Sequence, residues 1–151
     1  SNAGNALSGK LLGKEDFTSL TILSKDLIKY NLIVAGVLAL IFAALYPILG
    51  RTFSNDLEVI GHFYSVFWLI IVAQFVSGVT FTYDGIFKGL GETKYLRNTL
   101  IVATFFVFIP ISYLLDGFGL QLYAVWIAFL VWNMFRGASL IYKFRKKYYT
   151  L

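Results

Sequence analysis

The sequence contains no cysteine and a single histidine, His62. The absence of cysteine excludes a disulfide framework, a thiolate metal site and a cysteine nucleophile. One histidine leaves no cluster of imidazoles for a metal ion. Motifs of serine hydrolases, P-loop proteins and zinc proteases are missing as well, because the glycines of "GIFKGLGETK" at 85–94 lack both the P-loop order and a preceding strand. We therefore expect neither an enzyme nor a bound cofactor.

Charged residues are also scarce in this sequence. Only 14% of the 151 residues are charged and 58% are hydrophobic, with a mean hydropathy of +0.73, whereas soluble domains carry about 25% charged residues. This composition excludes a disordered chain and a water-soluble globule. Four runs without Asp, Glu, Lys or Arg, each 18–25 residues long, match the length that a helix needs to cross a bilayer: 30–50, 59–83, 98–115 and 117–135. We predict an all-α integral membrane bundle of four transmembrane helices, with the lipid bilayer as its solvent.

The few basic residues alternate between the two ends of these spans. They gather before the first span, between the second and third, and after the fourth, whereas the other two loops hold Arg51 alone. The positive-inside rule therefore places both termini and the second loop in the cytoplasm. The basic tail is expected to contact lipid headgroups rather than nucleic acid, because it follows a span directly. The residues on the predicted cytoplasmic side are Lys10, Lys14, Lys25, Lys29, Lys88, Lys94, Arg97, Lys143, Arg145, Lys146 and Lys147.

Four regions are expected along the chain. Residues 1–3 are typical of the remnant of a cleaved expression tag. Residues 4–29 combine the end of a truncated helix with an amphipathic cytoplasmic segment, in which apolar residues recur at helical spacing. Residues 30–142 form the four-span bundle, and residues 143–151 form a basic cytoplasmic tail. We expect from the opening of the chain that it is a fragment of a longer protein.

Polar side chains inside the second span share one helical stripe, formed by Gln74, Ser77, Asp84 and Lys88. Because polar groups are costly in hydrocarbon, such a stripe marks either a helix-packing face or a transport pathway. For Gln74 and Ser77, the sequence favours neither of these two roles over the other. Beside the stripe, Gly85–Gly89 has the GxxxG spacing of a helix-packing motif.

Two charges of opposite sign lie inside the predicted spans at matching depth. Asp84 comes four residues before Lys88, and Arg136 comes seven residues before Lys143. An unpaired charge there costs about 2.5–3.5 kcal/mol or more on insertion scales. We therefore predict that Asp84 and Arg136 pair, with Arg97 as the competing partner for Asp84.

The stretch "YDGIFKGLGETKYLRNTL" at 83–100 carries a family resemblance. Its Asp-Gly, its Gly-Leu-Gly-Glu-Thr loop and its Arg97–Asn98 pair resemble the tenth and eleventh helices of the multidrug and toxic compound extrusion (MATE) family. The match looks closest to the DinF-like branch of that family. "GNALSGKLLGKED" at 4–16 is similar to the segment that closes the family's eighth helix, and "FRGASL" at 135–140 resembles its twelfth helix.

The resemblance implies an antiporter of the bacterial inner membrane that exchanges cationic or amphipathic drugs outward against Na⁺ or H⁺. It implies twelve helices in two bundles, of which this chain supplies helices nine to twelve and the end of the eighth, so that the N-terminal helices are missing partners. One branch carries a cation-binding carboxylate where this sequence has Ser77, so we do not expect that cation site. The residues that we expect at a pathway or gate are Gln74, Ser77, Asp84, Arg97, Asn98, Asn133 and Arg136.

Two other functions remain open from the sequence. A related flippase for lipid-linked oligosaccharides shares the architecture. Such a flippase is expected to have a wider and more cationic central cavity, whereas this sequence offers only Arg97 and Arg136 as candidate cations. A four-span membrane protein without transport activity is the third possibility.

Overall fold

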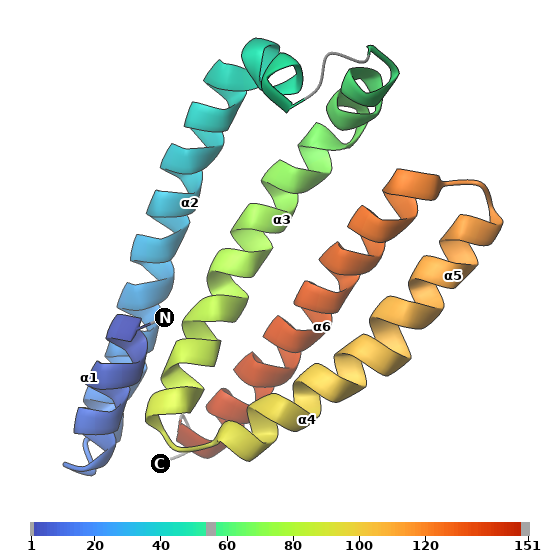
Figure 1. Ribbon diagram of the computed structural model, residues 1–151. Helices are drawn as coiled ribbons and strands as arrows, with labels where there is room; N and C mark the ends of the chain where they lie inside the picture. Colours follow the sequence, from blue (N-terminus) through green and yellow to red (C-terminus); the bar gives the residue numbers. More distant parts are fainter. Residues whose placement is uncertain (1, 54–56, 149–151) are drawn as a thin grey trace.

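The computed structural model describes residues 2–53 and 57–148, and the regular structure within them is helical (Figure 1). Four helical segments are long and apolar enough to cross a membrane, at Phe17–Leu49, Leu57–Gly89, Thr93–Gly117 and Leu122–Tyr148. This confirms the predicted all-α bundle of four transmembrane helices. The elements are α1 (Asn2–Leu12), α2 (Phe17–Phe53), α3 (Leu57–Gly89), α4 (Thr93–Ala103), the π-helix η1 (Thr104–Phe108), α5 (Ile109–Gly117) and α6 (Gln121–Tyr148).

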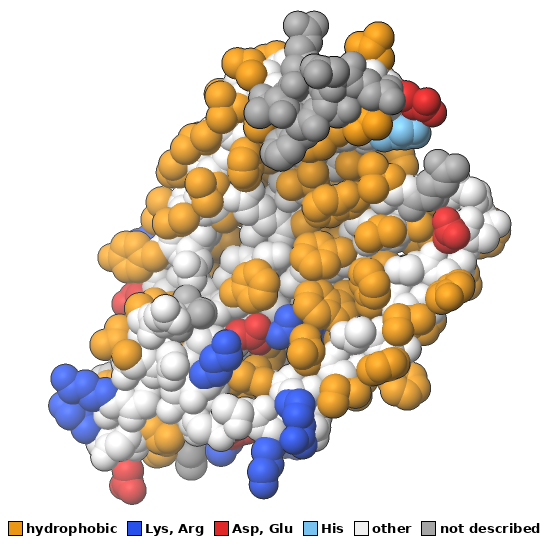
Figure 2. Space-filling view, viewed as in Figure 1, with side chains coloured by type: hydrophobic (Ala, Val, Ile, Leu, Met, Phe, Trp, Pro, Cys, Tyr) orange, Lys and Arg blue, Asp and Glu red, His pale blue; other side chains and the backbone are white. Residues whose placement is uncertain are grey.

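The long helices stand side by side in one row, in the order α2, α3, α6 and the rod formed by α4, η1 and α5 (Figure 1). Short α1 lies against the lower ends of α2 and α3. Lys and Arg side chains gather at this lower end on the face shown in Figure 2, whereas hydrophobic side chains cover most of the rest. We call this end the basic end of the bundle. It comprises α1, the α3–α4 turn at 90–92 and the last turns of α6.

Helix α2 begins directly after Asp16, whose Oδ1 accepts a hydrogen bond from the Ser19 N–H at 2.9 Å. Hydrogen bonding by Ser19 lowers the pKa of the Asp16 carboxyl below its ordinary value, as is usual for a carboxylate at a helix N-terminus. The helix continues to Phe53 with Pro47 inside it, and no Gly or Pro lies between its start and Gly36. The predicted amphipathic segment and the first span therefore form one helix without a break at residue 29.

Parts of the expected regions fall outside the described residues. Ser1 of the expected tag remnant, 54–56 of the expected outer loop and 149–151 of the expected tail lie there. Asn2 and Ala3 belong to α1, and residues 143–148 belong to the last turns of α6.

The third span contains one turn of π-helix. This turn, η1, directly precedes α5, which carries Pro110 in its first turn. Proline lacks the N–H for a helical hydrogen bond, and a wider π turn is a common way to accommodate the lost bond. A proline often kinks or ends a helix, whereas this structure shows a local change of helix type within a span that continues to Gly117. The span ends at a turn in which Gly119 adopts a φ of 77°, which favours glycine.

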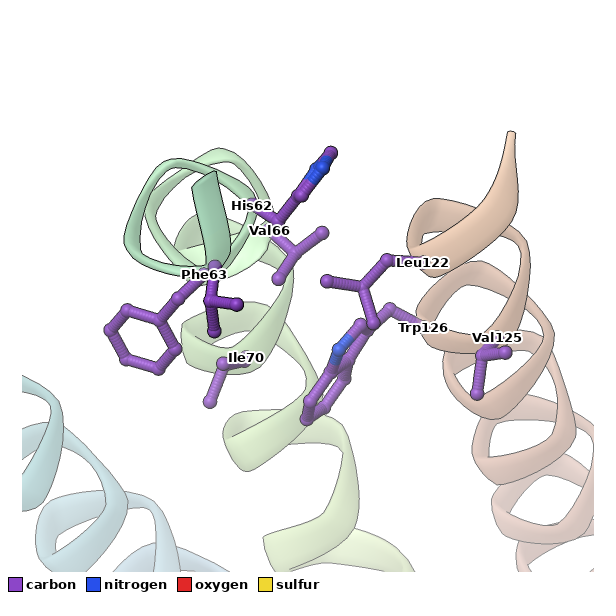
Figure 3. A pocket seen from close by; sticks show the side chains of 8 residues that line it. His62, Phe63, Val66, Ile70, Leu122, Val125 and Trp126 are labelled. Carbon is purple, nitrogen blue, oxygen red and sulfur yellow. The ribbon is translucent and has the colours of Figure 1, made fainter. Parts of the chain in front are cut away.

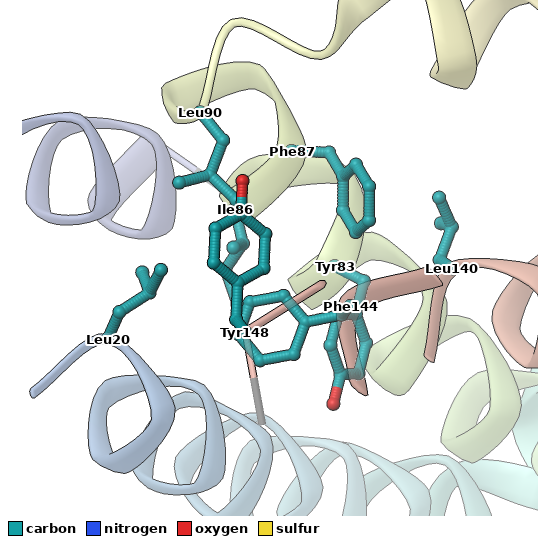
Figure 4. Close-up of a cluster of buried hydrophobic side chains, with 8 residues drawn as sticks. All are labelled: Leu20, Tyr83, Ile86, Phe87, Leu90, Leu140, Phe144 and Tyr148. Carbon is teal, nitrogen blue, oxygen red and sulfur yellow. The ribbon is translucent and has the colours of Figure 1, made fainter. Parts of the chain in front are cut away.

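The main hydrophobic core lies at the basic end, where α2, α3 and α6 meet (Figure 4). Its largest fully buried side chains include Phe87 and Phe144, and Tyr148 from the last turn of α6 packs against the ring of Phe17. The side chains converge in Figure 4 from three helices far apart in the sequence. The core therefore fixes the relative positions of these helices at this end. Its members are Leu20, Tyr83, Ile86, Phe87, Leu90, Leu140, Phe144 and Tyr148.

Small residues allow α1 to approach α3 closely. The Ser8 hydroxyl donates a hydrogen bond to the Ile86 carbonyl at 3.1 Å. A Cβ added at Gly89 would overlap both the Asn5 carbonyl oxygen and the Ser8 hydroxyl. The GxxxG spacing of Gly85–Gly89 thus serves helix packing, as in many membrane helix pairs.

Candidate functional site

The predicted pair of buried charges is present between α3 and α6. One terminal guanidinium nitrogen of Arg136 donates to both carboxylate oxygens of Asp84, at 2.9 Å and 2.7 Å. Only 7% of the Arg136 side chain and 12% of the Asp84 side chain are exposed. Both residues lie inside segments that span the membrane. Each side chain therefore neutralises the charge of the other, because an unpaired charge inside the membrane is costly.

The Arg136 side chain also rests on an aromatic ring. Its guanidinium carbon lies 4.7 Å from the centroid of the Trp132 ring, within range of a cation–π contact. The Trp132 indole N–H in turn donates to the Thr104 hydroxyl in η1 at 3.2 Å. Contacts thus run from Asp84 through Arg136 and Trp132 to the π turn, and they connect α3, α6 and the third span.

Backbones of α3 and α6 come close together one turn from the ion pair. The Thr80 hydroxyl donates to the Asn133 carbonyl at 3.1 Å, and a Cβ added at Gly137 would lie 2.8 Å from the Thr80 hydroxyl oxygen. Asn133 is fully buried, and its side-chain amide donates to the Phe129 carbonyl at 3.4 Å. This close approach brings α6 near enough for Arg136 to reach Asp84.

Two atoms of this site lack a hydrogen-bond partner. They are the Nε of Arg136 and the Oδ1 of Asn133, both buried. Buried polar atoms are normally paired with protein groups or with ordered water. Asn133, which the sequence places among the candidate residues, therefore lies one turn before Arg136 on α6 with its side-chain oxygen buried.

Arg97 and Asn98 are not brought together with Asp84. Both side chains are exposed near the start of α4, and the Arg97 guanidinium donates to the Asn98 side-chain oxygen at 3.4 Å. The ion pair of Asp84 is with Arg136. Arg97, the competing partner expected from the sequence, is therefore exposed and is not the partner of Asp84.

Gln74 and Ser77 line a different space, a cavity of about 290 Å³ between α2 and α3. The Gln74 Oε1 atom is buried and has no hydrogen-bond partner. Below the cavity, the Asn31 amide donates to the Thr82 hydroxyl and joins the two helices. We call this space the α2/α3 groove. Its lining residues are Asn31, Val34, Ala35, Leu38, Gln74, Ser77, Gly78 and Phe81.

A larger cavity opens between α3 and α6 at the end opposite the basic end (Figure 3). Its volume is about 660 Å³, and its walls include Phe63, Val66, Ile70 and Trp126. His62 stands at its upper edge in Figure 3. Among the described residues, no group of three or more His, Cys, Asp or Glu is placed to hold a metal ion. We call this cavity the outer pocket; its surface suits an apolar molecule.

An ionic cluster at the basic end was not predicted from the sequence. Glu92, in the α3–α4 turn, pairs with Lys147 and, at 3.6 Å, with Lys143. Burial raises the pKa of the Glu92 carboxyl, but hydrogen bonding and positive charge from Lys147 and Lys143 outweigh burial, so this pKa lies below its ordinary value of 4.5. The Lys143 ammonium also lies 4.5 Å from the Tyr95 ring centroid. The only signal in the sequence was the i, i+4 spacing of two lysines on α6.

The MatE family model matches residues 1–114, from α1 through most of the third span. No curated protein and no solved structure matches the chain. The match covers more than half of the chain, and the four membrane-spanning helices agree with a family of membrane transporters. The chain therefore belongs to the MatE, or multidrug and toxic compound extrusion, family.

Proposed function

We propose that this chain is part of a cation-coupled multidrug efflux antiporter that works by alternating access in the bacterial inner membrane. Its substrate is a cationic or amphipathic small molecule, and its coupling ion is Na⁺ or H⁺. Both ends of the chain face the cytoplasm, and the remaining transporter helices are its partners. Membership in the MatE family supports the transport class.

The observation that carries this proposal is the buried pair of Asp84 and Arg136. A transporter that alternates between two states moves packed groups of helices as units. The pair, with its contacts to Trp132 and Thr104, holds α3, α6 and the third span together inside the membrane. It acts as a clamp that lets these helices move as one body.

The lining of the two cavities favours a drug-like substrate over a lipid-linked oligosaccharide. Neither the outer pocket nor the α2/α3 groove has a Lys or Arg among its described lining residues. Arg136 is neutralised by Asp84, and Arg97 is exposed at the start of α4. Anionic pyrophosphate-linked sugars would need such charges, whereas the aromatic walls of the outer pocket suit the apolar part of an organic cation.

Reconstituted vesicles test this proposal. The whole protein is placed in liposomes, and a Na⁺ or pH gradient is imposed in the presence of a fluorescent organic cation. We expect the dye to cross the membrane in the direction opposite to the downhill flow of the coupling cation. We expect no dye movement in vesicles without protein or without a gradient. Movement of a labelled lipid-linked oligosaccharide instead would identify a flippase. A protein that moves neither probe under either gradient would be a membrane protein of another function.

A further inference from the structure

The π turn in the third span is not imposed by proline alone. In η1 the Ile109 N–H donates to the Thr104 carbonyl, which lies one residue farther back than the acceptor in an α-helix. Pro110 follows this turn directly. Pro47, however, lies inside α2, which stays α-helical around it. Because this chain accommodates a proline within an α-helix, a second contact must select the π form at η1.

Helix α6 supplies this second contact. The Trp132 N–H donates to the hydroxyl of Thr104, the first residue of the π turn. Two neighbours on α6 orient the Trp132 ring: Phe129 stacks on it at a centroid distance of 5.7 Å, and the Arg136 guanidinium lies 4.7 Å from its centroid. Asp84 binds that guanidinium. The ion pair therefore helps to determine where the donor to Thr104 lies.

The π turn keeps one face of the third span directed toward α6. Ala103 is fully buried on this face before the turn. After the turn, half-buried Phe108 and Ser112 line spaces shared with α6. The step from Ala103 to Phe108 is five residues, whereas an α-helix repeats a face every three or four residues. In a continuous α-helix, the smaller Val107 would therefore take the place of Phe108.

A cavity beside Phe108 provides space for this change. Its volume is about 220 Å³, and the other lining residues all come from α6: Val125, Trp126 and Phe129. Val125 and Trp126 also line the outer pocket. Replacement of Phe108 by Val107 on the inward face would thus enlarge the apolar cavity that adjoins the outer pocket.

We propose that η1 is a two-state switch of the third span, and that the Asp84–Arg136 pair sets its state through Trp132. In the π form, Trp132 holds Thr104 and Phe108 faces α6. When the pair opens, Trp132 releases Thr104 and the turn becomes α-helical. Helices α4 and α5 then rotate relative to each other by about 100° around their common axis, the angle of one residue. The proposal concerns the fold and does not rest on the transport activity proposed above.

The distance between two spin labels on the third span tests this switch. The chain has no cysteine, so nitroxides can be attached at Ile101→Cys and Tyr113→Cys, where the native side chains are exposed. On a continuous α-helix these two positions point about 120° apart, but they point about 20° apart when the π turn absorbs one residue. The same helix dimensions make the distance between the labels about 4 Å longer in the α form.

Ile33→Cys and Leu45→Cys on α2 form the matched control pair. These positions are exposed and have the same separation in sequence, but the helix between them is α-helical throughout. The dipolar coupling between the labels is measured on the whole protein in lipid nanodiscs. The control pair should give the longer distance in every variant, which also shows that the variant is folded.

The parent protein should give the shorter distance on the third span. Thr104→Val removes the acceptor with little change of shape, and the neutral double variant Asp84→Asn/Arg136→Gln removes the charge that orients Trp132. Each should add a population at the longer distance. Thr104→Val combined with Pro110→Ala removes both causes of the π turn and should show the longer distance alone. An unchanged short distance in any of these variants, or a long distance in the parent, would overturn the proposal.

Discussion

Arg136 holds both carboxylate oxygens of Asp84 with one terminal nitrogen, although 52 residues separate the two side chains in sequence. The pair joins α3 to α6 at a depth where the surroundings are apolar. Removing one partner from such a pair leaves a bare charge, and removing both leaves none. The two helices therefore depend on the pair more than they would on a surface salt bridge, and this dependence can be measured.

Replacing Gly89 by alanine should detach α1 from α3. The added methyl group would overlap the Asn5 carbonyl oxygen, which is backbone and cannot swing aside, so α1 must shift. We expect a loss of about 1–3 kcal/mol in the free energy of unfolding, as for other overpacked sites. Hydrogen exchange should rise within α1.

Gly61→Ala is the matched control, because nothing lies within 4 Å of a Cβ added at Gly61. Alanine favours a helix over glycine by about 1 kcal/mol at most, so this variant should keep or slightly gain stability. Equal effects of the two substitutions would show that the contact between α1 and α3 does not limit stability.

The cluster around Glu92 should make stability depend on pH in the acid range. The pKa of Glu92 is lowered in the folded protein, so its contribution is present above the ordinary value of 4.5 and is lost as pH falls through the folded pKa. At neutral pH, Glu92→Gln should cost no more than about 1 kcal/mol, because solvent screens a partly exposed pair.

Melting curves recorded from pH 7 down to acid check this expectation. The Glu92→Gln variant should lose less stability than the parent between neutral and acid pH, and added salt should narrow the difference between them at neutral pH. Asp116→Asn, at an exposed carboxylate, is the control and should follow the parent. If Glu92→Gln and the parent fall in parallel, the cluster contributes nothing to acid stability.

The orientation in the membrane is open to a labelling experiment. Thr93 and Gly117 are exposed at opposite ends of the third span, and the chain has no cysteine to compete. A cysteine at Gly117 should react with an impermeant thiol reagent added outside intact cells. A cysteine at Thr93 should react only after the membrane is opened. The opposite pattern would contradict the orientation that the basic residues predict.

The sequence predicted the spans and the Asp84–Arg136 pair for the same reason. Charge is so scarce in this chain that each uncharged run outlines a helix, and two lone charges at equal depth have few other partners. The GxxxG spacing of Gly85–Gly89 indicated a helix-packing face, although it did not indicate that α1 is the helix that approaches Gly89. In these cases composition and spacing alone carry the information.

Other features depend on tertiary geometry that spacing does not encode. The bond of Trp132 to Thr104 requires the π turn before Pro110, which changes the direction of the side chains in the third span. The contact of Glu92 with Lys147 requires the last turn of α6 to pass the α3–α4 turn. The sequence places Gln74 and Asp84 on one stripe of α3, but in the structure Gln74 lines the α2/α3 groove and Asp84 pairs with Arg136 of α6. The two side chains have different surroundings because α2 and α6 pack on different sides of α3.

A double-mutant cycle on Asp84 and Arg136, followed by thermal melting of the whole protein in detergent, tests the central claim most directly. Asp84→Ala and Arg136→Ala should each cost about 3–5 kcal/mol, because each leaves an uncompensated buried charge. The double variant should be more stable than either single variant, so the coupling energy should exceed the cost of a single substitution and be about 3 kcal/mol or more. Additive losses, with the double variant the least stable of the three, would contradict the account of this pair as the clamp between α3 and α6.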